Sequence, residues 1–225
     1  MSKFTISEAV QYGWDTTLQN LGILIAVVAV GWVIPYIPSA ISAGVGRNSS
    51  IIAGGISLIF SILGAGFSLI IQIGLIKVAL KIHDGQAADF SDLFSHAHLF
   101  LKFLLGSILY AMVILAGMIL LIVPGIVWAV KYQFLPYLIV DRELGPMGAL
   151  RKSGEITEGF KWDIFALDLA LAGINLAGAI FTCGLGLLLT IPISMMTTAY
   201  VYRRLAGNNE TQEAEQALSM PGAIG

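Results

Sequence analysis

Long apolar runs alternate with short polar segments along most of the chain. An α-helix rises about 1.5 Å per residue, so roughly 20 apolar residues cross the hydrocarbon core of a bilayer. The runs predict an all-α fold, an integral membrane bundle of six transmembrane helices with short interfacial helices on the cytoplasmic side. A single transmembrane domain, 1–206, would contain spans at about 21–37, 51–76, 99–123, 126–140, 164–182 and 187–203.

Prolines, glycines and polar clusters predict where the runs end. Pro35 and Pro38 close the first run, and Pro124-Gly125 is typical of a tight turn between the third and fourth. The apolar stretch 164–201 is too long for one crossing, and the sequence CGLG at 183–186 predicts a hairpin at its middle. Residues 207–225 are polar and acidic, so we expect a disordered C-terminal tail.

Lysine and arginine positions predict the orientation, because loops on the cytoplasmic side of a membrane are enriched in both residues. With the N-terminus inside, the outer loops contain Arg47 alone, and Lys131 lies within a span. The other basic residues fall in cytoplasmic segments or at adjoining span ends: Lys3, Lys77, Lys81, Lys102, Arg142, Arg151, Lys152, Lys161, Arg203 and Arg204. We therefore expect a multi-pass protein of the cytoplasmic (inner) membrane with both termini on the cytoplasmic side.

The composition fits a surface that faces lipid. Hydrophobic residues make up 57% of the chain and charged residues 12%, against about 25% charged residues in a typical soluble domain. The net charge of -2 provides no basic field for nucleic acid. Membrane lipids are the expected partners, together with a membrane-protein partner or further copies of the chain. Cys183 is the only cysteine, which excludes an internal disulfide, and no cofactor is predicted.

Three units of the chain follow one plan, in which a short polar segment leads into an apolar hairpin. The units open at residues 4–8, 90–94 and 145–150, and they end with LIKVALKIHDG, LPYLIVDREL and AYVYRRLAG. Either the chain contains a true internal repeat, or helical hairpins end this way by default. In both cases we expect each opening segment to form a short helix along the cytoplasmic interface.

Small and polar residues recur along one face of the second span. Their spacing of three and four residues places them on a single stripe, made of Gly54, Ser57, Ser61, Gly64, Ser68 and Gln72. Small residues let helices approach closely in lipid, so a helix-packing seam is favoured over a pore lining. Gly173 and Ala177 form a shorter patch of the same kind in the fifth span.

Two ionisable residues lie inside predicted spans, Lys131 in the fourth and Asp168 in the fifth. A charge inside the bilayer costs several kcal/mol, so such residues are functional candidates. We expect Lys131 and Asp168 to form a pair between the two spans, with Gln133, Gln72 and Asn175 completing a polar network. A structural ion pair is favoured over a transport or proton-relay site.

Neither a metal site nor an enzyme is indicated by the remaining polar residues. His96 and His98 are two residues apart, whereas a helical zinc pair needs a spacing of about three or four. A helix cap formed by Asp89 or Ser91 is the simpler interpretation of that segment. The GxSxG, HExxH, Walker and GxGxxG motifs do not occur in the sequence. We therefore assign no catalytic residue and no metal ligand.

A family resemblance rests on residues 124–162. Its motif positions are Pro124-Gly125, Lys131, Pro136, Asp141, Gly145-Pro146, Ala149-Leu150, Ser153, Thr157-Glu158-Gly159 and Trp162, with Tyr12-Gly13-Trp14 and Tyr202-Arg203-Arg204-Leu205 at the two ends. The pattern resembles uncharacterised prokaryotic six-span membrane proteins related to the membrane domain of glycerophosphodiester phosphodiesterases. Gly154 and Glu158 depart from it, because relatives often carry a bulky residue where Gly154 stands and a basic residue near Glu158.

The resemblance implies a topology and no active residues. The catalytic barrel of the phosphodiesterases is missing, so hydrolysis does not carry over. Residues 147–158 would form a cytoplasmic interfacial helix with Arg151 and Lys152 toward lipid headgroups. The sequence therefore favours a non-enzymatic scaffold, assembly factor or lipid-associated accessory protein. The alternative is a small transporter or channel that uses the Lys131–Asp168 pair, and an intramembrane enzyme comes third.

Overall fold

The computed structural model describes residues 4–33 and 51–219, and these residues form helices and no strand. Pro35, Pro38 and Arg47, which entered the prediction of the first span and its loop, lie outside the described residues. The elements in chain order are α1 (Ile6–Gln19), α2 (Leu21–Val33), α4 (Ile51–His83), η1 (Phe90–Leu93), η2 (Ala97–Leu99), α5 (Phe100–Leu120), α6 (Ile122–Tyr132), α7 (Leu135–Arg142), α8 (Pro146–Ile156), α9 (Lys161–Phe181) and α10 (Leu187–Ser219).

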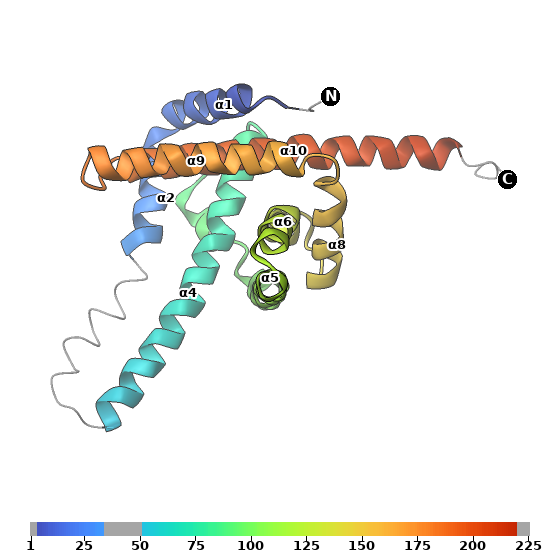
Figure 1. Cartoon of the computed structure of the whole chain (residues 1–225). Helices are drawn as coiled ribbons and strands as arrows, with labels where there is room; N and C mark the ends of the chain where they lie inside the picture. The colour runs from blue at the N-terminus through green and yellow to red at the C-terminus, as the bar shows by residue number, and fades with distance from the viewer. Residues whose placement is uncertain (1–3, 34–50, 220–225) are drawn as a thin grey trace.

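The long helices are arranged as three pairs that point away from a shared centre. One pair is α2 with α4, the second is α5 with α6 and its continuation α7, and the third is α9 with α10. The pairs run in three different directions: α4 descends obliquely, α9 and α10 lie crosswise above it, and α5 and α6 are seen end-on (Figure 1). Short helices precede the pairs, namely α1, η1 with η2, and α8, at the three predicted opening segments.

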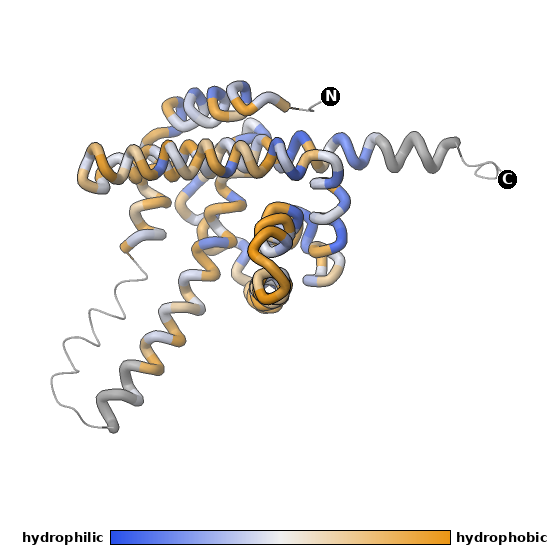
Figure 2. The backbone as a smooth tube through the Cα atoms, in the orientation of Figure 1, coloured by the Kyte–Doolittle hydropathy of each residue, from blue (hydrophilic) through white to orange (hydrophobic). Residues whose placement is uncertain are grey.

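Four helical segments are long and apolar enough to cross a membrane: Leu58–His83, Phe90–Leu120, Ile122–Arg142 and Lys161–Phe181. A fifth is counted if α1 and α2, which meet at an angle of 97°, form one bent span. Figure 2 shows the hydrophobic residues that run along α5 and α6. Helix α10 is not among these segments, because Thr190, Ser194, Arg203 and Arg204 make it more polar. The described structure is therefore all-helical with several apolar helices.

The turn between the third and fourth predicted spans lies at Leu121, three residues before the proline that was expected to form it. Leu121 has an extended backbone, with φ -170° and ψ 153°, and α6 begins at the next residue. Pro124 and Gly125 instead belong to the first turn of α6, where a proline loses no helical hydrogen bond because N–H groups there have no partner. Helix α6 then stops at Tyr132, and α7 restarts at Leu135 with Pro136 in its first turn.

The predicted disordered tail is wrong for residues 207–219, which continue α10 as far as Ser219. The sequence NNETQEAEQALS is polar, but Glu, Gln, Ala and Leu are all good helix formers. The polar composition therefore indicates that this segment is not buried, but it is compatible with a helix. Residues 220–225 lie outside the described residues.

The core lies where the ends of the three pairs meet. Phe134, Leu138, Ile139 and Tyr202 are at most 1% exposed, and all belong to α7, the α6–α7 link or α10. The distal tips of the α5–α6 and α9–α10 hairpins are instead exposed. Phe181 at the end of α9 is 85% exposed and Leu185 in the turn to α10 is 73% exposed, and the α5–α6 tip is similar.

Candidate functional site

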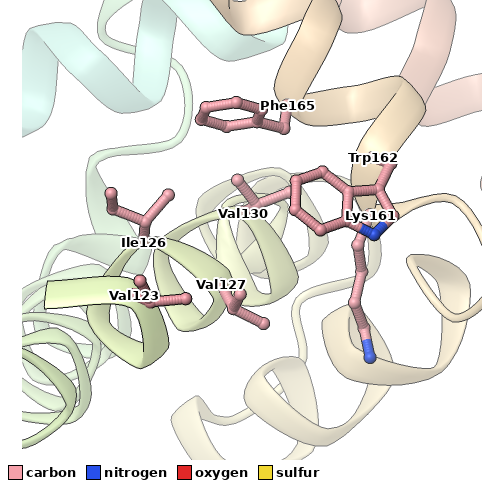
Figure 3. A pocket seen from close by; sticks show the side chains of 7 residues that line it. All are labelled: Val123, Ile126, Val127, Val130, Lys161, Trp162 and Phe165. Carbon is pink, nitrogen blue, oxygen red and sulfur yellow. The ribbon is translucent and has the colours of Figure 1, made fainter. Parts of the chain in front are cut away.

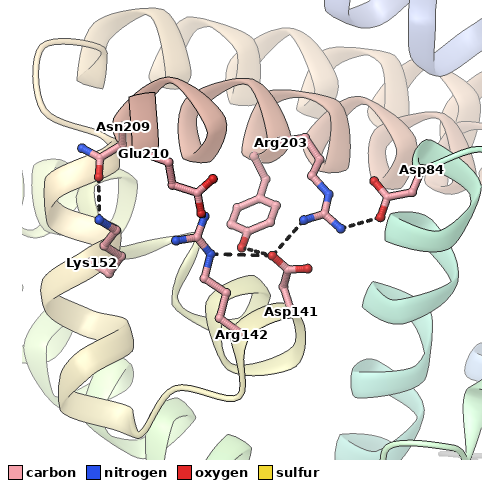
Figure 4. Close-up of polar contacts among 8 residues, drawn as sticks. Asp84, Asp141, Arg142, Lys152, Arg203, Asn209 and Glu210 are labelled. Atoms are coloured by element: carbon pink, nitrogen blue, oxygen red, sulfur yellow. Dashed lines mark hydrogen bonds and ion pairs between the residues drawn. The ribbon is translucent and has the colours of Figure 1, made fainter. Parts of the chain in front are cut away.

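One arginine joins the ends of all three helix pairs. Arg203 of α10 donates from Nη1 to Oδ2 of Asp141 on α7 at 2.9 Å, and from Nη2 to Oδ2 of Asp84, just after α4, at 2.6 Å (Figure 4). The side chain of Asp141 is 13% exposed and that of Arg203 27% exposed. A guanidinium has five donors in a rigid plane, so it can hold two carboxylates at once. We call Arg203, Asp141 and Asp84 the polar hub.

Further contacts extend from the polar hub along α10. The hydroxyl of the fully buried Tyr202 donates to the same Asp141 oxygen at 2.7 Å. Arg142 pairs with Glu210 at 2.7 Å, and Lys152 of α8 donates to Asn209 at 2.6 Å (Figure 4). Glu210 and Asn209 lie in the segment that was expected to be disordered, so these contacts help explain why α10 continues past residue 207.

Helix α1 is held against α10 by a second polar cluster. Tyr200 and Arg204 of α10 both donate to Oε1 of Glu8, at 2.5 and 2.7 Å. The hydrogen bond from the Tyr200 hydroxyl holds the pKa of the Glu8 carboxyl below its ordinary value, and the charge of Arg204 acts in the same direction. Tyr12 of α1 stacks on Tyr200 with ring centroids 4.6 Å apart. These contacts hold α1 against α10.

The closest approach between α1 and α10 occurs at Gly13. A Cβ atom there would lie 2.1 Å from Oγ1 of Thr197 and 2.7 Å from the Ile193 carbonyl oxygen. Any side chain would therefore push the two helices apart. The motif Tyr12-Gly13-Trp14 thus has a physical basis: Tyr12 stacks, Gly13 permits contact, and Trp14 is 46% exposed at the surface.

The end of α4 is also tied to the segment that opens the second unit. Nζ of Lys81 donates to both oxygens of Asp92 at 2.9 Å, and Asp92 also accepts from the backbone N–H of Asp89 at 2.8 Å. Asp89 in turn accepts from the N–H of Ser91 at 2.9 Å, which confirms Asp89 as the cap of η1. Nearby, a Cβ on Gly74 would lie 2.3 Å from the Leu93 carbonyl oxygen, so α4 and η1 pack closely.

Helix α8 supports the chain where α6 ends. The hydroxyls of Ser153 and Thr157, both fully buried, donate to the carbonyl oxygen of Lys131 at 3.2 and 3.0 Å. A buried hydroxyl needs a partner, and a carbonyl near a helix break needs a donor. Two positions of the family-like motif therefore serve one structural purpose, which is to close the end of α6.

The expected Lys131–Asp168 ion pair is not formed between these two described residues. Nζ of Lys131 lies 5.3 Å from the centre of the Tyr132 ring and 3.8 Å from the position a Cβ would take on Gly154, so the side chain faces α8. Asp168 lies beside the side chain of Gln133. Lys131 and Gln133 are two positions apart, and side chains with this spacing on a helix point to different sides, so Lys131 faces α8 while Gln133 lies beside Asp168. Gly154 leaves room for the lysine, because a Cβ there would lie 3.0 Å from Cε of Lys131.

The other members of the predicted polar network lie apart. The side-chain amide of Asn175 donates to the Leu171 carbonyl at 3.0 Å and to Oγ of Ser194 at 2.8 Å, which links α9 to α10. Gln72 lines a groove of about 490 Å³ bounded by α2, α4, α7 and α10, together with Ser194 and Thr198. The network is therefore divided between two places and does not form one site.

The predicted small-residue stripe contributes little close packing where it is described. The side chains of Gly54 and Ser57 lie outside the described part of the structure; Ser61 is exposed, and Gly64 and Ser68 are half-buried. In α9, nothing lies within 4 Å of a Cβ on Gly173 and Ala177 is exposed, whereas a Cβ on Gly178 would lie 2.9 Å from Thr190. Gly117 and Gly125 bring α5 and α6 together more tightly, with a Gly117 Cβ 2.9 Å from the Gly125 Cα.

The two residues predicted to contact headgroups differ in their surroundings. The side chain of Arg151 is 83% exposed and lies 3.5 Å from Glu155. The side chain of Lys152 is only 15% exposed, because it turns inward to Asn209. Arg151 is therefore free to face a membrane surface, and Lys152 belongs to the contacts around α10.

Comparison with known proteins places the chain near an uncharacterised family. A family model described as "Protein of unknown function (DUF975)" matches residues 111–209, a segment that includes Asp141 and Arg203. The uncharacterized proteins Rv2560 of Mycobacterium tuberculosis and Mb2590 of Mycobacterium bovis are each 26% identical over 144 residues, or 64% of this chain. The chain covers 44% of the length of each of these relatives. No solved structure matches the chain.

These matches support an uncharacterised family, as the sequence predicted. They show no link to glycerophosphodiester phosphodiesterases, so that part of the resemblance stays a prediction. The polar hub is not predicted from the sequence, because its charged residues lie at the ends of the three units. The three unit ends carry Asp84, Asp141 and Arg203, and opposite charges at equivalent places are the signal that could have identified it.

Proposed function

We propose that this chain is a polytopic protein of the cytoplasmic membrane that acts as a non-enzymatic scaffold or lipid-associated accessory. In this proposal the apolar hairpins enter the bilayer as six spans, both termini stay on the cytoplasmic side, and the polar hub joins the hairpins at that side. The observation that carries the proposal is the separation of surfaces: ion pairs join the described ends of the hairpins, and exposed apolar side chains run along the hairpins and cover the α5–α6 and α9–α10 tips.

The physical argument concerns the cost of exposed apolar surface. Soluble monomers rarely expose contiguous apolar patches larger than a few hundred Å². Here the α5–α6 tip alone presents Ile119, Leu120, Leu121, Ile122 and Val123, each at least 67% exposed. Lipid removes that cost, since hydrocarbon tails solvate such side chains. Figure 2 shows this tip as a continuous hydrophobic stretch.

Crossing one flat bilayer requires a further condition. The hairpins point in different directions in the structure (Figure 1), so they would have to turn toward a common direction about the polar hub. If the α9–α10 hairpin kept its crosswise direction, it would lie along the membrane surface and would not cross. The six-span proposal and a surface-lying hairpin therefore differ in where the α9–α10 turn is found.

Cys183 in that turn provides the test, because it is exposed and is the only cysteine. Intact cells producing the full chain are treated with a membrane-impermeant maleimide. Six spans with a cytoplasmic N-terminus place Cys183 outside, so we expect labelling without permeabilisation. The matched variant Cys183→Ser with Thr211→Cys should be labelled only after permeabilisation. Labelling of Cys183 only after permeabilisation would contradict the proposed topology.

The alternative proposals have less support. A small transporter or channel based on Lys131 and Asp168 would need the two side chains to share a site, and they face different neighbours. An intramembrane enzyme would need convergent catalytic groups, and no observation on the described residues favours one. Kinship with the membrane domain of glycerophosphodiester phosphodiesterases would fit the same topology. A membrane-protein partner or further copies of the chain could cover the exposed apolar faces.

A further inference from the structure

An apolar slot of about 240 Å³ lies between α6 and α9 (Figure 3). One wall is a stripe of α6 residues at helical spacing, Val123, Ile126, Val127 and Val130. At about 1.5 Å per residue the stripe extends for roughly 10 Å along α6. It runs from the polar end of the hairpin near Lys131 toward the apolar tip at Leu121.

The other wall begins at the first turn of α9. Trp162 and Phe165 face the valine stripe, with their rings 6.1 Å apart and at 86° to each other. Lys161 also lines the slot, and its amine extends away from Phe165, beyond the apolar lining (Figure 3). The slot therefore has apolar walls with a tryptophan and a lysine together at one end, the arrangement that side chains adopt at a membrane–water interface.

The charge at that end has no counterpart within the part of the chain that the structure describes. Lys81, Arg142 and Arg203 are each paired with a carboxylate, whereas no described residue forms an ion pair or hydrogen bond with the Lys161 amine. Glu158 and Asp163 flank Lys161 in the sequence, and neither lines the slot. A half-buried, unpaired cation above an apolar slot is complementary to a ligand with an anionic head and an apolar tail.

We propose that this slot binds one acyl chain of an anionic phospholipid, with the lipid phosphate at Lys161 and the chain along α6 toward the hairpin tip. This inference rests on the proposed membrane location. Basic pockets on the cytoplasmic side of transmembrane helices bind anionic headgroups, and each lysine near such a surface strengthens binding about five-fold. Trp162 covers the glycerol level and Phe165 contacts the chain.

The test uses full-length protein in phosphatidylcholine vesicles that contain a minor fraction of lipid brominated in its acyl chains. Bromine quenches tryptophan fluorescence on contact, and subtracting the signal of Trp162→Phe isolates the contribution of Trp162. We expect brominated phosphatidylglycerol to quench Trp162 at several-fold lower lipid fraction than brominated phosphatidylcholine. Lys161→Ala should reduce this preference about five-fold, and Lys161→Arg should retain it. Val127→Phe, which fills the slot, should weaken quenching by both lipids.

Lys77→Ala is the matched control, since Lys77 is also half-buried and carries no ion pair to a described residue. Its preference for phosphatidylglycerol should equal that of the wild type. Equal quenching by the two brominated lipids in the wild type would overturn the inference, as would an unchanged preference in Lys161→Ala. Absence of quenching by either lipid would instead contradict the membrane location on which the inference rests, so the two failures are distinguishable.

Discussion

The hub end and the tip differ in the α5–α6 and α9–α10 hairpins: polar contacts join the hub ends, and exposed apolar side chains cover the tips. At the hub end, Arg203, Asp141 and Tyr202 are joined by hydrogen bonds of 2.7 to 2.9 Å between side chains from separate helices. At the tips, Ile119, Leu121 and Phe181 are between 69% and 85% exposed. The directional contacts at the hub end therefore determine how the hairpins are joined. The apolar side chains at the tips favour only removal from water. Substitutions at the two ends should have very different consequences.

The largest expected effect is the loss of Arg203. Arg203→Ala leaves Asp141 and Asp84 without their shared partner, and one carboxylate is 13% exposed. Breaking a buried ion pair costs roughly 3–5 kcal/mol, and the partial exposure of Arg203 reduces the expected loss to about 3 kcal/mol. The measurement is the free energy of unfolding in lipid nanodiscs. Arg151→Ala, which removes an 83% exposed side chain, is the control and should change it by less than about 0.5 kcal/mol.

The second effect concerns the contact between α1 and α10. Gly13→Ala places a methyl group 2.1 Å from the Thr197 hydroxyl, and overpacking of this kind costs roughly 1–3 kcal/mol. We expect a loss of about 2 kcal/mol in the same unfolding measurement, with faster proteolysis of α1. Gly22→Ala is a matched control because nothing lies within 4 Å of its Cβ position. Equal stability of the two variants would refute the close contact.

A smaller effect should appear on acidification. Because the Tyr200 hydroxyl lowers the pKa of Glu8 in the folded chain, ionised Glu8 favours the folded state. That contribution is present above the ordinary carboxyl pKa and is lost as the pH falls through the lowered pKa. The melting temperatures of wild type and Glu8→Gln should therefore differ at neutral pH and converge in acid. Asp15→Asn on the same helix is the control, and a gap that persists in acid would contradict the assignment.

The smallest expected effect on folding lies at a tip. Leu121 is 69% exposed and forms the turn between α5 and α6, so Leu121→Ala should change the free energy of unfolding by less than about 0.5 kcal/mol. Leu121→Asp should also leave the hub intact while reducing membrane insertion, since a buried charge costs roughly 2.5–3.5 kcal/mol on insertion scales. Fractionation of membranes separates the two variants. A large folding defect in Leu121→Ala would show that the tips do more than avoid water.

Apolar run length predicted the helical architecture well, and it predicted the helix boundaries less well. Helices α5 and α9 start and end within a few residues of the predicted third and fifth spans. The turn lies at Leu121 and not at Pro124-Gly125, because a proline in the first turn of a helix is well tolerated and does not end it. The helix past residue 207 is not predicted, because polarity does not distinguish an exposed helix from a disordered segment.

The polar contacts were harder to predict, for a geometric reason. The depth of Lys131 and Asp168 along separate helices predicts a pair, but depth does not predict which side of α6 the lysine occupies, and Lys131 faces Gly154 of α8. Arg203 contacts residues 62 and 119 positions earlier, and no local pattern encodes such a separation. What the sequence did contain was charge at three equivalent unit ends, and only the arrangement of the hairpins shows that these charges meet.

The central claim is that Arg203 couples the hairpins through Asp84 and Asp141, and a double-mutant cycle tests it most directly. Arg203→Gln and Asp84→Asn are measured singly and together by unfolding in nanodiscs, with Arg151→Gln replacing Arg203→Gln in a parallel cycle. We predict that the double variant loses about 1 kcal/mol less than the sum of the single variants, because both remove the same interaction. Additivity within roughly 0.3–0.5 kcal/mol, as expected for the Arg151 cycle, would contradict the account.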